Sequence, residues 1–201
     1  MTIDQIIDNI WRRQDEILSN LNFEDIAVYV FLKNEYNKGN ILNNFVFQYV
    51  FKSWWGINNA KWSNKLKNCY FDLLANQQTA LKAILTTLYE VPTSKGVHAV
   101  HFAFATKLLH TINNENPIFD SMVGKIIGMS VVGNNKDEKI NSCIEIQNYL
   151  KDLYKKLLTD TKIQQTISNF RTRFDVDIKK MSDTKILDSI IWSLGKNELK
   201  K

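Results

Sequence analysis

Apolar residues recur every three or four positions along most of the chain, the spacing of helices that turn one face to a core. The first such stretch begins at Thr2 or Asp4, either of which can cap a helix, and ends before Asn22. The same spacing predicts further helices over residues 25–37, 63–74, 79–89, 97–109, 120–127, 140–158, 162–174 and 183–194. Asp120 is expected to cap the helix that Gly128 ends.

The run from residue 44 to residue 55 has a different pattern, because its apolar residues point to nearly all sides. Its composition also fits a buried strand. Its length, and the spacing of Gln48, Lys52 and Ser53, favour a buried helix.

Composition supports a single helical domain over residues 1–201. Seven glycines and two prolines are few for 201 residues, and an all-β sandwich needs more turn residues. With 44% hydrophobic and 23% charged residues, the chain can bury a sizeable core. We therefore expect an all-α, compact multi-helix domain.

The net charge and the two cysteines limit which partners and which metal sites we expect. The net charge of +5 fits a polyanionic partner such as DNA without demanding one. Cys69 and Cys143 lack metal-ligand spacing, which excludes a structural zinc and a four-cysteine iron–sulfur cluster, and we expect no metal and no cofactor. The chain shows no signal-peptide pattern and no run of about 18 uncharged apolar residues, so we expect a cytoplasmic protein outside the membrane, nucleoid-associated when bound to DNA.

One ordered set of motifs has a possible chemical role. It consists of Val-Pro-Thr-Ser-Lys-Gly-Val-His at 91–98, a helix rich in small residues, and Pro-Ile-Phe-Asp-Ser-Met-Val at 117–123. This order resembles the helix-hairpin-helix DNA glycosylase superfamily, in particular its bacterial 8-oxoguanine glycosylase-like branch. Segments 51–58 and 185–195 are also similar to that branch. The resemblance implies a core at about 84–128 and an enzyme that flips a damaged or modified base out of DNA and hydrolyses its N-glycosidic bond.

The resemblance also implies roles for individual residues. Asp120 would stabilise positive charge on the sugar as the catalytic carboxylate. The substrate-binding candidates are Trp55, His98, His101, Phe104 and Ser121, and the hairpin backbone at Lys95, Gly96 and Val97 would contact the DNA phosphates.

Two positions depart from the superfamily pattern. The second hairpin glycine is replaced by His98, and the position of the lysine that forms a Schiff base holds Val100. Lys107 is the remaining catalytic lysine candidate, although it lies two to three helical turns farther on and enters the site only if the helices are rearranged. We therefore expect a monofunctional enzyme that leaves an abasic site.

Each candidate also has a structural explanation. Asp120 can be a helix cap alone, Lys107 a surface lysine, and the tryptophans core residues, with Trp55 the expected exception because it borders Gly56. The three histidines at 98, 101 and 110 do not share an i, i+4 face, which disfavours a metal site. A catalytically inactive DNA-binding module and a helical protein-interaction domain are the alternative functions. The base, the oligomeric state and the pathway, repair or phage defence, stay open at this stage.

Overall fold

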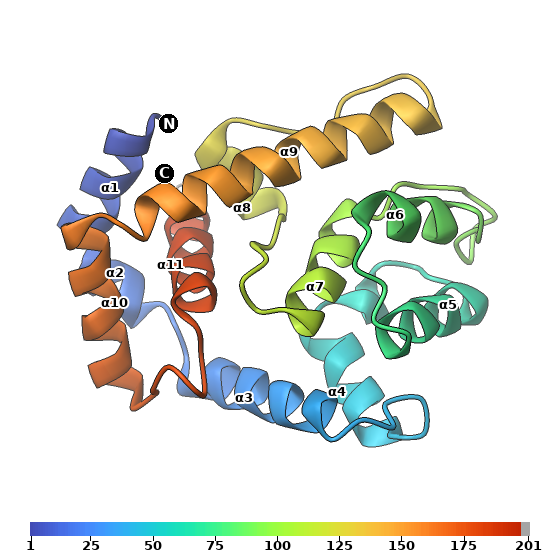
Figure 1. Cartoon of the computed structure of the whole chain (residues 1–201), viewed down its shortest axis with the longest axis horizontal. Helices are drawn as coiled ribbons and strands as arrows, with labels where there is room; N and C mark the ends of the chain where they lie inside the picture. The colour runs from blue at the N-terminus through green and yellow to red at the C-terminus, as the bar shows by residue number, and fades with distance from the viewer. Residues whose placement is uncertain (198–201) are drawn as a thin grey trace. The chain divides into compact units, whose positions relative to one another are not determined.

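The computed structural model describes residues 1–197, and over that range its regular elements are all helices, with no strand (Figure 1). This confirms the all-α prediction. No helix among these residues is long and apolar enough to cross a membrane. In chain order the elements are α1 (Ile3–Arg12), α2 (Gln14–Ser19), α3 (Phe23–Asn37), α4 (Phe45–Trp54), the 3₁₀ turn η1 (Ile57–Asn59), α5 (Asn64–Ala75), α6 (Leu81–Tyr89), α7 (Phe102–Ile112), α8 (Ser121–Ile127), α9 (Lys136–Leu157), α10 (Thr161–Phe174) and α11 (Asp183–Asn197).

The chain divides into two compact units, each built from separate stretches of sequence. The first unit comprises residues 1–26, 114–131 and the chain from 145 onward, and the second comprises residues 27–113 and 132–144. The two are described separately below. That one domain spans residues 1–201 stays a prediction.

In the first unit, α11 packs against α8, α2 and α10, while α1 packs against α10 (Figure 1). The core of this unit is aliphatic, and α11 buries Ile186, Leu187, Ile190, Ile191 and Leu194. A Cβ atom added at Gly195 would lie 2.8 Å from the Met122 carbonyl oxygen, so the glycine allows α11 to approach the backbone of α8 this closely.

In the second unit, α5, α6 and α7 pack against one another, and η1 packs on α4 (Figure 1). Its core contains a cluster of aromatic side chains. The Phe51 ring lies 5.3 Å from Phe47, 5.6 Å from Phe71 and 6.0 Å from Tyr70, measured between ring centroids. These spacings are those of tilted and edge-to-face pairs, which add to the stabilisation that burial of the rings provides.

Local capping explains several of the helix ends. Thr2 forms a capping box with Gln5, Ser63 caps α5, and Asp120 caps α8, which Gly128 ends in the left-handed conformation at φ +70°. The predicted caps at Thr2, Asp120 and Gly128 are therefore confirmed. Each satisfies backbone groups that a helix terminus leaves without an intrahelical partner.

Three predicted helix boundaries were wrong. The helix expected from Thr2 to before Asn22 is two helices, broken at Arg13, where φ is −113°. The helix expected over 97–109 begins at Phe102, because residues 97 and 98 bond back to the preceding loop instead of continuing a helix. Helix α9 begins at Lys136, four residues before the expected start.

Helix α4 is a helix as predicted, but it is not buried on all sides. Phe47 and Phe51 are fully buried, whereas Phe45, Val46 and Tyr49 are 74%, 65% and 69% exposed. The uniform apolar composition concealed an ordinary two-faced helix, because only the contacts of the folded chain decide which of its aromatic residues lie inside.

Candidate functional site

The predicted site residues are divided between the two units. Asp120 and Ser121 belong to the first unit, and all the others, from Trp55 to Lys107, belong to the second. The two sets are therefore described one after the other.

Asp120 lies half-buried at the start of α8, with its backbone extended. One carboxylate oxygen, Oδ1, accepts hydrogen bonds from the Met122 and Val123 N–H groups at 2.9 and 3.0 Å. This is the geometry of a helix N-cap, and it fixes the carboxylate in one orientation. Ser121 is the first residue of the helix and is exposed.

Three hydrogen bonds hold the loop that leads into Asp120. The Gln147 amide on α9 donates to the Pro117 carbonyl at 3.0 Å, and the Ser182 hydroxyl donates to the Asn114 carbonyl at 3.1 Å. Farther along α11, the Thr184 hydroxyl donates to the Glu115 carboxylate at 2.7 Å. The loop is thus held from α9 and from the start of α11, which limits how far Asp120 can move.

A buried polar network lies close to Asp120 within the first unit. Lys185 Nζ lies 2.8 Å from Asp188 Oδ2, and both side chains are only 7% exposed. The Tyr154 hydroxyl donates to Asp188 Oδ1 at 3.4 Å. Burial raises the pKa of Tyr154 well above its usual value, and the charges of Asp188 and Asp120 raise it further, which places Asp120 within electrostatic range of the network.

This network was not predicted from the sequence. Its only sequence signal is the Lys185–Asp188 spacing of three residues, which places both on one helix face. Tyr154 comes from α9, and no local pattern links it to α11.

In the second unit, Lys107 lies between two aromatic rings. Its Nζ donates to the Trp55 carbonyl at 3.0 Å and lies 5.3 Å from the centroid of the Trp55 ring and 5.1 Å from that of Phe104. A carbonyl oxygen and two ring faces stabilise a positive charge. Trp55 is only 9% exposed and therefore packs in the core, although the sequence predicted it to be the one tryptophan outside the core.

His101 lies one helical turn before Phe104 and contacts Trp62. The Trp62 indole N–H donates to His101 Nδ1 at 3.2 Å, and the two ring centroids are 4.9 Å apart. Desolvation lowers the pKa of His101 to about 4. The imidazole is therefore neutral at pH 7. Trp62 is 4% exposed, which agrees with the core role expected of the tryptophans by default.

Two N–H groups of the hairpin loop between α6 and α7 that were predicted to contact phosphate form hydrogen bonds within the loop. Gly96 N–H donates to the Thr93 carbonyl at 3.0 Å, and Val97 N–H donates to the Thr93 hydroxyl at 3.3 Å. Gly96 has φ +75°, which a tight turn requires. Since both N–H groups already have acceptors, a phosphate could use them only by displacing these bonds. Lys95 is exposed.

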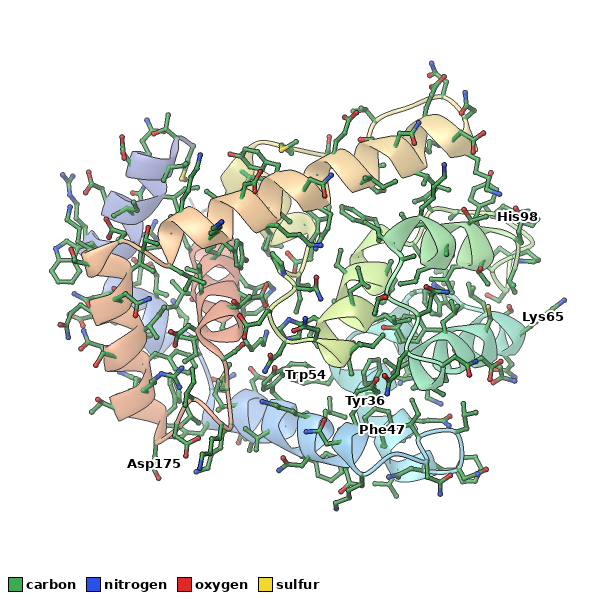
Figure 2. The ribbon with its side chains drawn as sticks, viewed as in Figure 1. Tyr36, Phe47, Trp54, Lys65, His98 and Asp175 are labelled. Carbon is green, nitrogen blue, oxygen red and sulfur yellow. The ribbon has the colours of Figure 1, made fainter. Side chains whose placement is uncertain are left out.

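His98 belongs to a separate cluster. Its Nδ1–H donates to the Tyr89 carbonyl at 2.6 Å, and its ring lies 5.7 Å from the Tyr89 ring. Lys136 lies 5.2 Å from the Tyr89 ring and forms an ion pair with Glu90, whose pKa this hydrogen bond lowers. Figure 2 shows His98 in the loop, well separated from Trp54 on α4. The structure thus brings Trp55, Phe104 and Lys107 together, with His101 beside Phe104, and leaves His98 apart.

Within residues 1–197 no three His, Cys, Asp or Glu side chains gather closely enough to hold a metal ion. Comparison of the chain with known protein families, with curated proteins and with solved structures gives no match.

Proposed function

We propose that this protein binds DNA and hydrolyses the N-glycosidic bond of a damaged or modified base, without cleaving the strand. In this proposal the fold is that of a helix-hairpin-helix glycosylase, and Asp120 is the catalytic carboxylate. The proposal rests on the resemblance of segments 91–98 and 117–123, on the net positive charge, and on the geometry around Asp120.

The observation that carries the proposal is the state of the Asp120 carboxylate. It is held by two backbone N–H groups, it is half-buried, and the loop before it is held by hydrogen bonds from two helices. Hydrogen bonds from N–H groups favour the ionised form of a carboxylate. A carboxylate that is fixed and still partly reachable is what a reaction through an oxocarbenium-like sugar requires.

The proposed reaction has three requirements that this chain can meet. The target nucleotide leaves the duplex, at a cost of a few kcal/mol, and its base lies against aromatic side chains. The Asp120 carboxylate then stabilises the positive charge that develops on the sugar as the bond to the base breaks. Water completes the reaction at the sugar carbon, and the products are a free base and an abasic site. No lysine forms a covalent intermediate in this scheme.

The test is release of free base from duplexes that carry 8-oxoguanine, hypoxanthine, uracil or 5-hydroxymethyluracil, detected by mass spectrometry. Wild-type protein is compared with Asp120→Asn, which keeps the cap because Asn and Asp cap helices about equally well. Asp160→Asn is the matched control, since Asp160 Oδ1 accepts from Lys162 and Ile163 in the same way at the start of α10. We expect release by wild type and Asp160→Asn only. Equal release by Asp120→Asn would remove Asp120 from the chemistry.

One observation favours a second candidate, a DNA-binding module without chemistry. The hydrogen bonds that Asp120 Oδ1 accepts from Met122 and Val123 are those of an N-cap, so a structural role alone explains its type and position. In that case DNA binding is salt-sensitive, no base is released from any duplex, and Asp120→Asn binds DNA as tightly as wild type.

A further inference from the structure

Among the described residues, His101 has a buried polar atom without a hydrogen-bond partner. Its Nε2 is inaccessible to solvent, and the side chain is only 9% exposed. Buried polar groups nearly always have partners, so each exception calls for a physical explanation. A buried polar atom without a partner weakens the fold, so it is retained more readily at a functional site than in a core that serves only packing.

The contact with Trp62 decides which nitrogen of His101 carries the proton. An indole N–H can only donate, so His101 Nδ1, which it contacts at 3.2 Å, must be the unprotonated acceptor. A neutral imidazole with unprotonated Nδ1 has its proton on Nε2. The two nitrogens point in diverging directions in the ring plane. Nε2–H is therefore a hydrogen-bond donor that points away from Trp62.

The surroundings of His101 are aromatic, with one lysine beyond the rings. The Trp62 and Phe104 rings have centroids 4.7 Å apart, and Phe104 lies three residues after His101 on the same side of α7. Lys107 follows after three more residues and lies over the Phe104 ring. Phe104 and Lys107 are both partly exposed, so this side of α7 is reached from solvent past them.

We infer that His101 Nε2–H recognises a hydrogen-bond acceptor on the extruded nucleobase, a carbonyl oxygen or an unprotonated ring nitrogen, beside the Phe104 ring. The inference rests on the proposed function for the identity of the ligand. A neutral donor selects a neutral acceptor over a phosphate, for which a cation is the stronger partner. Because the Nε2 atom is enclosed, a base reaches it only when the side chains packed around it move.

The test compares the affinity of four proteins for two kinds of duplex. One kind carries 8-oxoguanine, hypoxanthine, uracil or 5-hydroxymethyluracil on a 2′-fluorinated sugar, which resists cleavage, and the other carries a tetrahydrofuran residue with no base. The proteins are wild type, His101→Phe, His101→Gln and the control His110→Gln. His110 is a buried histidine on the same helix whose Nε2 is hydrogen-bonded to the Tyr29 hydroxyl at 3.1 Å.

For the base that wild type prefers, we expect His101→Phe to weaken binding by on the order of tenfold, as loss of one hydrogen bond does. Binding to the tetrahydrofuran duplex should not change, because that duplex presents no acceptor. His101→Gln should retain most of the preference, since its Oε1 can accept from Trp62 while its amide donates. A purely structural role would weaken binding to both duplexes equally and would leave their ratio unmoved.

The outcomes separate this inference from the proposed function. If wild type releases a base but His101→Phe keeps the wild-type ratio of affinities, the inference is overturned and the glycosylase proposal stands. If the ratio changes as expected while wild type releases no base, recognition by His101 stands and hydrolysis is overturned. Failure of wild type to bind any duplex overturns both. If His101→Phe does not fold, the ratio for His101→Gln and the His101 Nε2–H NMR resonance decide the question, because that resonance should shift with base-bearing duplex only.

Discussion

The buried neutral imidazole of His101 makes stability depend on pH in a defined window. Its pKa in the folded protein is about 4, because burial disfavours the charged ring, against about 6.5 in an unfolded chain. Between these values the unfolded state binds more protons than the folded state, so stability falls as pH falls. The stabilisation that comes from the neutral His101 ring is fully present above pH 6.5 and is lost progressively as the pH falls to 4.

The magnitude follows from the two pKa values. Linkage gives a loss of roughly 2 kcal/mol from the free energy of unfolding between pH 7 and pH 5 for this one group. Four other carboxyls, those of Asp8, Glu35, Glu90 and Asp177, also have lowered pKa values. Their effects begin near their ordinary pKa of 3.8 to 4.5 and continue below it, so they fall outside this window.

The assay is urea unfolding of wild type and His101→Gln at pH 7, 6 and 5, followed by tryptophan fluorescence. Glutamine does not titrate, so the difference between the two proteins isolates His101 from every other group. We expect wild type to lose about 2 kcal/mol more than His101→Gln between pH 7 and pH 5. Parallel curves would refute the reasoning, since they would mean that His101 is hydrated or accepts a proton in the fold.

Three further predictions concern the first unit. Lys185→Met should lower the free energy of unfolding by about 3–5 kcal/mol because it leaves the Asp188 charge buried and unpaired, whereas replacing both residues by apolar ones should restore most of it in the same urea assay. Asp120→Ala should cost about 1 kcal/mol, and Asp120→Asn almost nothing, if the cap is what stabilises α8. In an open helix a change from glycine to alanine would stabilise the protein. Gly195→Ala should instead lower the free energy of unfolding by about 1–3 kcal/mol, because its Cβ meets the Met122 carbonyl at 2.8 Å. An unchanged melting temperature would show that α8 and α11 separate easily.

The sequence predicted what depends on neighbours a few residues away. Thr2, Asp120 and Gly128 act within one helical turn, so their roles follow from residue type and position. The predicted start of α7 was wrong because Val97 bonds to Thr93 in the hairpin loop and His98 bonds to Tyr89 at the end of α6, and these bonds compete with helix formation. Helical periodicity alone does not show that competition.

The sequence could not predict contacts between distant residues. His101 was a candidate for substrate binding, but the tautomer of its neutral ring is set by Trp62, which lies 39 residues away in the sequence. The same holds for Tyr154, which meets Asp188 from 34 residues away and was not a candidate at all. In both cases the chemistry depends on a donor or acceptor supplied by a distant part of the chain, and an amphipathic pattern specifies only that a residue faces inward.

The contacts of Lys107 bear on whether the proposed enzyme can form a covalent intermediate. A Schiff base requires an uncharged amine. Lys107 Nζ donates to the Trp55 carbonyl at 3.0 Å and lies 5.1 Å from the Phe104 ring centroid, and both contacts stabilise the charged ammonium.

We therefore expect that borohydride traps no adduct between wild-type protein and a duplex from which it releases a base. Lys107→Met should retain base release, with weaker binding than the control Lys65→Met, which changes an exposed lysine of α5 (Figure 2). An adduct present in wild type and Lys65→Met but missing from Lys107→Met would contradict this reasoning. It would mean that the amine loses its proton and leaves its contacts with Trp55 and Phe104 when DNA binds, and the monofunctional assignment would then give way to a lyase.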